Sequence, residues 1–439
     1  MQYPPYPLSS RARSIIFAVF TSLFLTIAPT VSLYTAGYRL SLHPLALRRV
    51  GVLSVDIEPN DAIVYLNNVR VVNSIPMRIS DLVPGTYNLR IEKNGYLSWV
   101  KDIVIEDNKT TYIKDTTLFL VNTPEAIESN DTLRDVFPSH DGKYIVEKFQ
   151  IVDQTKFVLF DTAQELATPI LSHTNSSTAN IVWSEKSNTL AIFEQKASST
   201  NILVLEANNP THYSNFHISG MPKYYQWKEN FYKNTFLFTL DDFIYTLDAQ
   251  KIYPPKALQT TSSVFFQDSN NADWYFDPIN KSLENTKESV YLGVNTIQKI
   301  VDINTNRAIV QTESGLLIAG RDEKKEIKSI GTKNFFYDVD RKEYIAWSPY
   351  ELWTMYDNGT IALLNRTSEE IQSVVALDKT GELLVVTGDK LLGFNPGYYV
   401  THEILSAVQV LRVTADKQKR TLYFFGTWQE KKGLYKLKY

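Results

Sequence analysis

The sequence predicts a mainly β protein that begins with one apolar helix. Three observations lead to this fold class. An uncharged apolar stretch near the N-terminus, residues 14–38, is long enough to cross a bilayer. Aromatic residues make up 13% of the 439 residues, and together with frequent Thr, Val and Ile they favour strands. Beyond residue 132, apolar segments and polar turns alternate with a period of about 40 residues, which is typical of repeated β-sheets.

The apolar stretch 14–38 is predicted to be a transmembrane helix. A helix rises about 1.5 Å per residue, so about 20 apolar residues cross a hydrocarbon core of about 30 Å. The alternative is a cleaved signal peptide, with Arg11 and Arg13 before an apolar segment at 15–27. Its small-residue cleavage site would be 35–37, where the apolar stretch is already too long for a signal peptide. The sequence therefore favours an uncleaved anchor in a lipid bilayer.

The orientation of this anchor is not settled by its flanking charges. Two arginines precede the span, and three follow it at Arg39, Arg48 and Arg49. The tail before the span, residues 1–13, is too short to fold, and long domains translocate largely regardless of their charge. We therefore expect a single-pass membrane protein with a cytoplasmic N-terminus and an extracytoplasmic body.

Composition excludes several classes of function. The formal net charge is -3 and no basic cluster stands out, so we expect no nucleic-acid partner. The chain has no cysteine, which excludes disulfides, thiol chemistry and cysteine-ligated zinc. The absence of cysteine does not decide the compartment, because many exported bacterial proteins also lack it.

Residues 50–120 are predicted to form a small antiparallel β-sandwich. Apolar and polar residues alternate along 53–58 and again along 87–92, as in half-buried strands. Asn67 and Asn68 lie between two such segments and suit a tight hairpin, since Asn accepts positive φ. Turn signals at this spacing predict six or seven short strands.

Two segments of this region, GVLSVDIEPNDAIVYLNNV and ISDLVPGTYNLRIEKNGYLSWV, resemble a PEGA domain. The tetrapeptide that gives the family its name corresponds to residues 59–62, Pro-Asn-Asp-Ala, of which the outer two letters match. The resemblance implies a small β-sandwich of the kind found in surface and envelope proteins, and it implies no catalytic residue.

Residues 133–439, after a predicted linker at 121–132, are predicted to form a β-propeller. Polar turns recur between apolar segments, with starts 34 to 45 residues apart, at Ser139, Ser184, Lys228, Asp268, Asp302, Asp338, Asp378 and Asp416. A period near 40 with three or four strands per unit is typical of propeller blades. The segments VFPSHDGKYIV and IVWSEKSNTLAIF resemble TolB-type or WD40-like repeats. We expect seven or eight blades; a stacked pair of sandwiches is the alternative, which the single period disfavours.

A search for chemistry finds no hydrolase, zinc-protease, Walker or dinucleotide-binding motif. The six histidines are scattered, which favours structural roles. The spacing of Asp302, Asn304, Asn306 and Glu313 fits a calcium loop, but Arg307 stands where that loop needs Gly. Its flanks read as strands, so a hairpin is the favoured interpretation. We therefore predict no catalytic, cofactor-binding or metal-binding residue and no cofactor.

The favoured hypothesis is a non-enzymatic, membrane-anchored envelope protein. Its propeller would bind protein or cell-wall glycan, and Trp347, Tyr350 and Trp353 are the predicted contacts because Pro349 suggests an exposed loop. One alternative is a glycan-active propeller enzyme that uses channel carboxylates. Adjacent acids such as Asp241-Asp242 and Glu369-Glu370 would face opposite ways on a strand, which disfavours them as catalytic pairs. Another alternative is an extracytoplasmic sensor that acts with a membrane partner.

Overall fold

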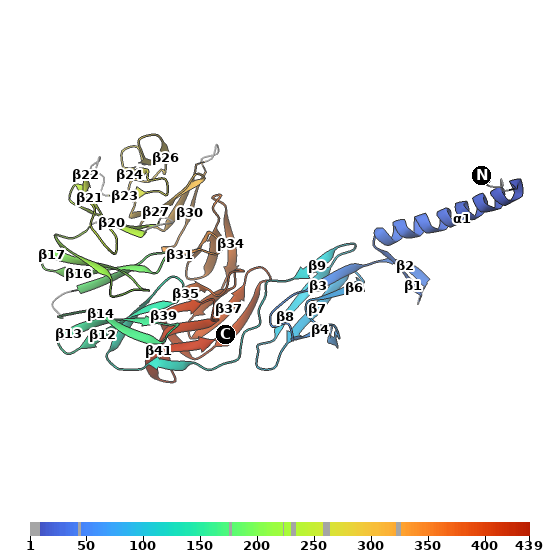
Figure 1. Ribbon diagram of the computed structural model, residues 1–439, viewed down its shortest axis with the longest axis horizontal. Coiled ribbons are helices and arrows are strands. Elements are labelled where there is room, and N and C mark those ends of the chain that lie inside the picture. The colour runs from blue at the N-terminus through green and yellow to red at the C-terminus, as the bar shows by residue number, and fades with distance from the viewer. Residues whose placement is uncertain are drawn as a thin grey trace, which may run out of the picture. The chain divides into compact units, whose positions relative to one another are not determined.

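The computed structural model divides the chain into two compact units, residues 1–119 and 120–439 (Figure 1). It describes residues 9–42, 45–174, 178–222, 224–229, 234–257, 264–321 and 326–439. The prediction of a mainly β protein with one N-terminal helix is confirmed, because strands account for nearly all the regular structure after that helix. Each unit is described below by itself.

The first unit starts with helix α1 (Ser10–Thr35), which is continuous through Pro29. Ser9 caps it, since its hydroxyl oxygen accepts a hydrogen bond from the Ala12 amide at 3.3 Å. The helix begins four residues before the start of the predicted span and ends three residues before the end of that span. It ends early because the chain turns at residues 36 and 37 into a hairpin of β1 (Tyr38–Leu42) and β2 (Leu45–Arg49). By length and composition α1 can cross a membrane, a test that a signal sequence also passes.

Seven strands follow and form the predicted sandwich: β3 (Gly51–Val55), β4 (Ile63–Leu66), β5 (Val69–Arg70), β6 (Met77–Leu82), β7 (Gly85–Glu92), β8 (Trp99–Ile105) and β9 (Thr110–Ile113). They make two sheets, in the orders β6-β3-β9 and β5-β4-β7-β8. Leu53, Leu89 and Trp99 are fully buried in this unit. The expectation of a purely antiparallel sandwich is wrong, since β3 and β9 pair in parallel and a parallel bridge joins Glu58 to Thr117. The predicted Asn turn is confirmed, with φ of 48° at Asn67 and 64° at Asn68.

In the described part of the second unit the strands form eight four-stranded antiparallel sheets, which we number as blades 1 to 8 (Figure 1). Blade 1 consists of β11 (Leu133–Pro138), β12 (Tyr144–Ile151), β13 (Gln154–Asp161) and β14 (Leu166–Thr174), and blade 2 of β15 (Thr178–Trp183), β16 (Thr189–Lys196), β17 (Ser199–Glu206) and β18 (Tyr213–Ser219). Blade 3 consists of β19 (Tyr224–Glu229), β20 (Asn234–Leu240), β21 (Phe243–Leu247) and β22 (Lys256–Ala257), and blade 4 of β23 (Phe265–Gln267), β24 (Asp273–Asp277), β25 (Ser282–Glu284) and β26 (Ser289–Tyr291).

Blades 5 to 8 continue the same meander. Blade 5 consists of β27 (Lys299–Ile303), β28 (Arg307–Gln311), β29 (Leu316–Gly320) and β30 (Ile327–Ile330), and blade 6 of β31 (Asn334–Asp338), β32 (Glu343–Trp347), β33 (Glu351–Met355) and β34 (Ile361–Arg366). Blade 7 consists of β35 (Ile371–Ala376), β36 (Leu383–Thr387), β37 (Lys390–Asn395) and β38 (Val400–Leu405). Blade 8 consists of β39 (Val408–Asp416), β40 (Thr421–Trp428) and β41 (Lys431–Lys438), with β10 (Glu125–Glu128) as its fourth strand.

Strand β10 closes the ring, because it comes first in this unit and pairs with β41, the last strand. An apolar cluster then joins the first and last blades of the second unit, with Leu133, Val136 and Ile145 from blade 1 against Phe425 and Leu434 from blade 8. The stretch 121–132, predicted as a linker, therefore contains a structural strand of the propeller. The first strands of neighbouring blades contact one another, as β11 and β35 do with β39, so they lie at the centre of the ring.

The eight predicted turns all fall between the first and second strands of their blades, and we call them the A–B turns. The third runs from Lys228 into residues 230–233, which lie outside the described residues. Most of them contain a side chain that accepts hydrogen bonds from the backbone amides of the turn: Ser184, Asp268, Asn304, Asp338, Asp378 and Asp416. Such side chains satisfy amides that the strand ladder leaves unpaired, which explains why the sequence shows the period so clearly.

Candidate functional site

The clearest candidate site is a cavity of about 440 Å³ among the first strands of blades 6, 7 and 8. We call it the central pocket. Phe336 and Tyr337 of β31, Ser373 of β35 and Thr414 of β39 line its wall, and the A–B turn of blade 1 adds His140. The pocket is thus made by elements that are far apart in sequence and meet only because the ring closes.

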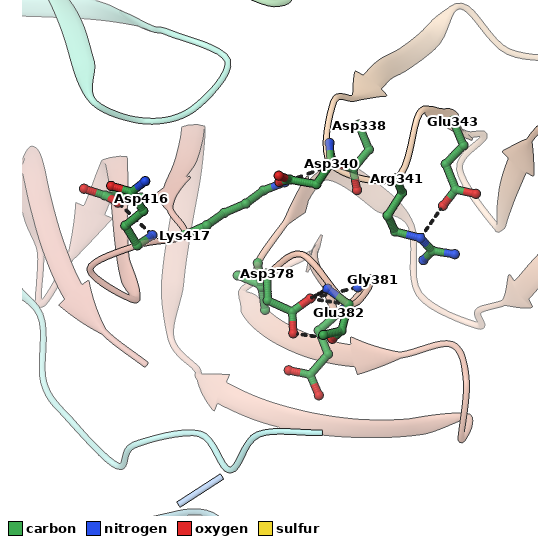
Figure 2. Close-up of polar contacts among 12 residues, drawn as sticks. Asp338, Asp340, Arg341, Glu343, Asp378, Gly381, Glu382, Asp416 and Lys417 are labelled. Atoms are coloured by element: carbon green, nitrogen blue, oxygen red, sulfur yellow. Dashed lines mark hydrogen bonds and ion pairs between the residues drawn. The ribbon is translucent and has the colours of Figure 1, made fainter. Parts of the chain in front are cut away.

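An ion-pair network crosses this pocket from blade 8 to blade 6 (Figure 2). The Lys417 ammonium lies 3.1 Å from Oδ1 of Asp338 and 2.8 Å from Oδ2 of Asp340. The Asp338 side chain has no exposed surface, whereas that of Asp340 is 31% exposed. A carboxylate so deeply buried is normally paired on both oxygens. Oδ2 of Asp338, however, has no hydrogen-bond partner among the described residues.

The A–B turn of blade 2 also reaches this region. Lys186 places its ammonium 5.0 Å from the centroid of the Tyr337 ring of blade 6, a cation–π contact. Blades 2 and 6 are opposite one another in a ring of eight, so Lys186 reaches across the centre. The turn is held by the Asn188 amide, which donates to Oδ2 of Asp141 in blade 1 at 3.0 Å.

Burial tunes the titrating groups beside the pocket. Desolvation lowers the pKa of His140, so its imidazole is neutral at pH 7. Burial raises the pKa of Asp141, but this effect is outweighed by the hydrogen bond from Asn188, the charge interaction with His140 and further hydrogen bonds within the turn. The pKa of Asp141 is therefore below its usual range. Burial likewise raises the pKa of Tyr337. At neutral pH the turn of blade 1 therefore presents a carboxylate and a neutral imidazole.

The pocket as a whole carries more acid than base. Five acidic side chains line it, at Asp141, Glu185, Asp338, Asp340 and Asp416, against three lysines, at Lys143, Lys379 and Lys417. This balance disfavours an anionic ligand and suits a neutral or cationic one. The aromatic side chains of β31 add apolar surface to the same wall.

The structure places the three predicted contact residues apart. Tyr350 is 53% exposed in the turn between β32 and β33, as expected for a loop. Trp347 is only 9% exposed and packs between blades 6 and 7, while Trp353 packs on the other face of the blade against the cluster shared with blade 5. The three side chains do not form one surface, because alternate residues of a strand face opposite sides. Trp347 borders the central pocket from within the core.

The calcium-like spacing belongs to a hairpin between β27 and β28, as the favoured interpretation predicts. Asn304 caps the turn by accepting the amides of Asn306 and Arg307 at 2.8 and 2.9 Å. The Asp302 carboxylate accepts a hydrogen bond from the guanidinium of Arg307, which lies 3.0 Å away. The Arg307 side chain is fully buried. A cation of the chain thus already occupies the acid that a calcium ion would need.

The sequence did not point to Asp338 and Lys417 as partners. Both were visible only as members of A–B turns, and 79 residues separate Lys417 from Asp338. The signal that could have paired them is the closed ring, which brings the turns of all blades to one face. Its closing strand, β10, lies within the predicted linker at 121–132.

These sheets define the class of protein: a β-propeller that follows a small β-sandwich and an apolar N-terminal helix. The family model of the PEGA domain matches residues 50–117, which is the sandwich of the first unit. Residues 50–117 are thus similar to a PEGA domain, and the propeller follows them in the chain. No significant match is found among curated protein sequences.

Several solved structures are similar to a large part of the chain. An uncharacterized protein from Listeria monocytogenes has 11% identity over 67% of this chain and 90% of its own, with a TM-score of 0.38. The Cps50 (Swd1) propeller domain of Myceliophteria thermophila has 11% identity over 72% and 99%, with a TM-score of 0.44. An oligogalacturonate lyase in complex with manganese has 10% identity over 72% and 96%, with a TM-score of 0.37. At these scores the likenesses say nothing about what this chain binds.

Proposed function

We propose that the protein is a membrane-anchored envelope protein whose propeller binds a protein or glycan ligand in the central pocket without transforming it. The observation that carries this proposal is the pocket itself, a cavity of about 440 Å³ with aromatic walls and an ordered ion-pair network. Concave sites with an apolar wall and a few fixed polar groups are where proteins usually bind small ligands or the ends of larger ones.

The proposed location rests on the apolar helix of the first unit. Helix α1 acts as an uncleaved anchor, residues 1–13 lie in the cytoplasm, and the PEGA domain and the propeller lie outside it. Long domains translocate largely regardless of their charge, which supports this orientation. The PEGA domain then acts as a stalk.

The enzyme alternative would use carboxylates of the pocket. Among the acids that line the pocket, Asp338 and Asp340 lie side by side on one turn, and both are paired with the ammonium of Lys417, which is an arrangement for binding rather than for proton transfer. The adjacent acids considered from the sequence lie elsewhere: Glu369 binds Lys390 at 3.1 Å, and Asp241 begins a turn at φ 52°. The sensor alternative needs a membrane partner that relays the binding event.

The test uses the full chain in detergent micelles, incubated with fragments of cell-wall glycan and envelope peptides. Mass spectrometry then identifies what is retained and whether it has been cleaved. Ser373→Trp fills the pocket and is expected to weaken retention about tenfold or more. Ile279→Ser, at an exposed position in a turn of blade 4, is the matched surface control and is expected to retain the ligand.

Two results would overturn the proposal. Cleaved products that disappear in Asp340→Asn would make the protein an enzyme. Retention that is equal in Ser373→Trp and the unchanged protein would place binding outside the central pocket.

A further inference from the structure

Four A–B turns begin with an aspartate that has the same local role. In each, Oδ1 accepts the amide of the residue two positions ahead, at 2.9 to 3.1 Å: Asp268, Asp338, Asp378 and Asp416. This common geometry allows the second carboxylate oxygens to be compared between blades.

The second oxygens differ. Oδ2 of Asp268 accepts from the Trp274 indole at 3.0 Å, and Oδ2 of Asp378 accepts from the Thr380 hydroxyl at 2.6 Å. Oδ2 of Asp338 is buried against the central pocket and has no hydrogen-bond partner among the described residues. A buried carboxylate oxygen without a donor is costly, so the site is suited to a donor from outside the chain.

The surrounding charges specify that donor. Asp338 and Asp340 share the single ammonium of Lys417, and the neighbouring Glu343 is paired with Arg341 at 2.9 Å (Figure 2). Asp338 and Asp340, the two of these carboxylates that line the pocket, thus share one ammonium, which leaves this pair with one uncompensated negative charge. The region already accommodates an ammonium on an aromatic face, that of Lys186 over Tyr337.

We propose that the central pocket recognises its ligand through a protonated primary amine, which donates to Oδ2 of Asp338 and to the carboxylate of Asp340. This inference rests on the proposed function and adds the chemistry of the ligand. The amine belongs to an amino sugar or to a lysine side chain, both of which present the same protonated primary amine.

Isothermal titration calorimetry on the full chain in micelles tests the inference with two probe pairs at about pH 6, where both amines are largely protonated. One pair is tetra-glucosamine and tetra-N-acetylglucosamine. The other is a short lysine peptide and its Nε-acetylated form. At least one free amine is expected to bind, with its acetylated counterpart at least about tenfold weaker.

Three variants sharpen the test. Asp338→Asn keeps the Oδ1 cap and replaces the free oxygen by an amide, so affinity is expected to fall about tenfold. Asp378→Asn is the matched control, at the same turn position with its second oxygen satisfied by Thr380, and it should leave the affinity within about twofold. Lys417→Met removes the competing ammonium and is expected to tighten binding.

The inference is overturned if no amine probe binds, if acetylated probes bind equally, or if Asp378→Asn weakens binding as much as Asp338→Asn. Loss of binding in Lys417→Met with an unchanged melting temperature would also contradict it. If envelope material binds in a Ser373-dependent way while amines do not, the amine chemistry fails and the proposed function stands. If neither binds, both fail.

Discussion

Glu147 is the residue whose charge we expect to affect stability most visibly. It lies on β12, and burial, with a smaller contribution from Glu128, raises its pKa to about 7. The native state therefore holds this proton more tightly than the unfolded chain, whose carboxyl has a pKa of 4.5. The contribution of Glu147 to the free energy of unfolding should therefore be greatest at or below about pH 4.5. This contribution should be lost as pH rises through about 7.

Glu147→Gln is expected to remove that part of the pH dependence. At about pH 8 the variant should be more stable than the unchanged protein, by on the order of 1–3 kcal/mol, since no charge is then buried. Chemical denaturation at several pH values measures this. Glu370→Gln, at an exposed position, is the control and should follow the unchanged protein. Identical pH profiles for Glu147→Gln and the unchanged protein would show that burial does not perturb this carboxyl.

Tyr350 tests the exposed loop of blade 6. Because more than half of the side chain is exposed, Tyr350→Ala should change the melting temperature by no more than about 2 °C. Thermal unfolding followed by circular dichroism is sufficient. Trp353→Ala, in which a core-facing ring is lost, should lower the melting temperature clearly in the same assay. A large fall for Tyr350→Ala would place its ring in the core.

At the scale of elements, Gly142 tests the seam between the first and last blades. It lies in the A–B turn of blade 1 with φ +68°, and a Cβ there would lie 2.6 Å from the backbone of Ala415 on β39. Gly142→Ala therefore combines left-handed strain with a backbone clash, and we expect a loss of about 2–4 kcal/mol. Gly359 has a similar φ of +82°, but the atom nearest to a Cβ placed there is 3.7 Å away. For Gly359→Ala we therefore expect a loss of stability of about 1 kcal/mol.

Denaturant titration of both glycine variants makes the comparison direct. Equal losses would mean that blades 1 and 8 do not approach one another as closely as the closed ring requires.

The elements also show which parts of the fold are visible in the sequence. The A–B turns were predictable because a local rule governs them: a capping side chain must satisfy nearby amides. The same holds for Asn67 and Asn68 at their hairpin. The role of β10 was not predictable, since a four-residue strand whose partner, β41, lies at the other end of the chain has no local signature. The parallel pairing of β3 with β9 was missed for the same reason.

The candidate site was predicted less well than the fold. Sequence reasoning selected Trp347, Tyr350 and Trp353 as a cluster because they are close in sequence. Along a hairpin such residues alternate between faces, so Trp347 and Trp353 enter different interblade cores. Asp338 and Lys417 meet only through ring closure, and neither residue looks unusual where it stands in the sequence.

At the scale of the whole molecule, the anchor and the orientation can be tested together. Protease added to intact cells should remove the propeller and leave a membrane-bound fragment that contains α1. The physical reason is that an uncleaved apolar helix holds the chain while the folded body is exported. A propeller that survives while a known surface protein is cut would invert the topology. A mature N-terminus beyond Tyr34 would show that α1 is a cleaved signal.

The central claim is that the central pocket holds a ligand that the protein does not alter. The most direct measurement is a structure of the full chain determined after incubation with envelope fragments. We expect density for an intact ligand among β31, β35 and β39, with a donor group at the free oxygen of Asp338. Ligand density at the Tyr350 turn beside an empty pocket, or a cleaved product in the pocket, would contradict the account.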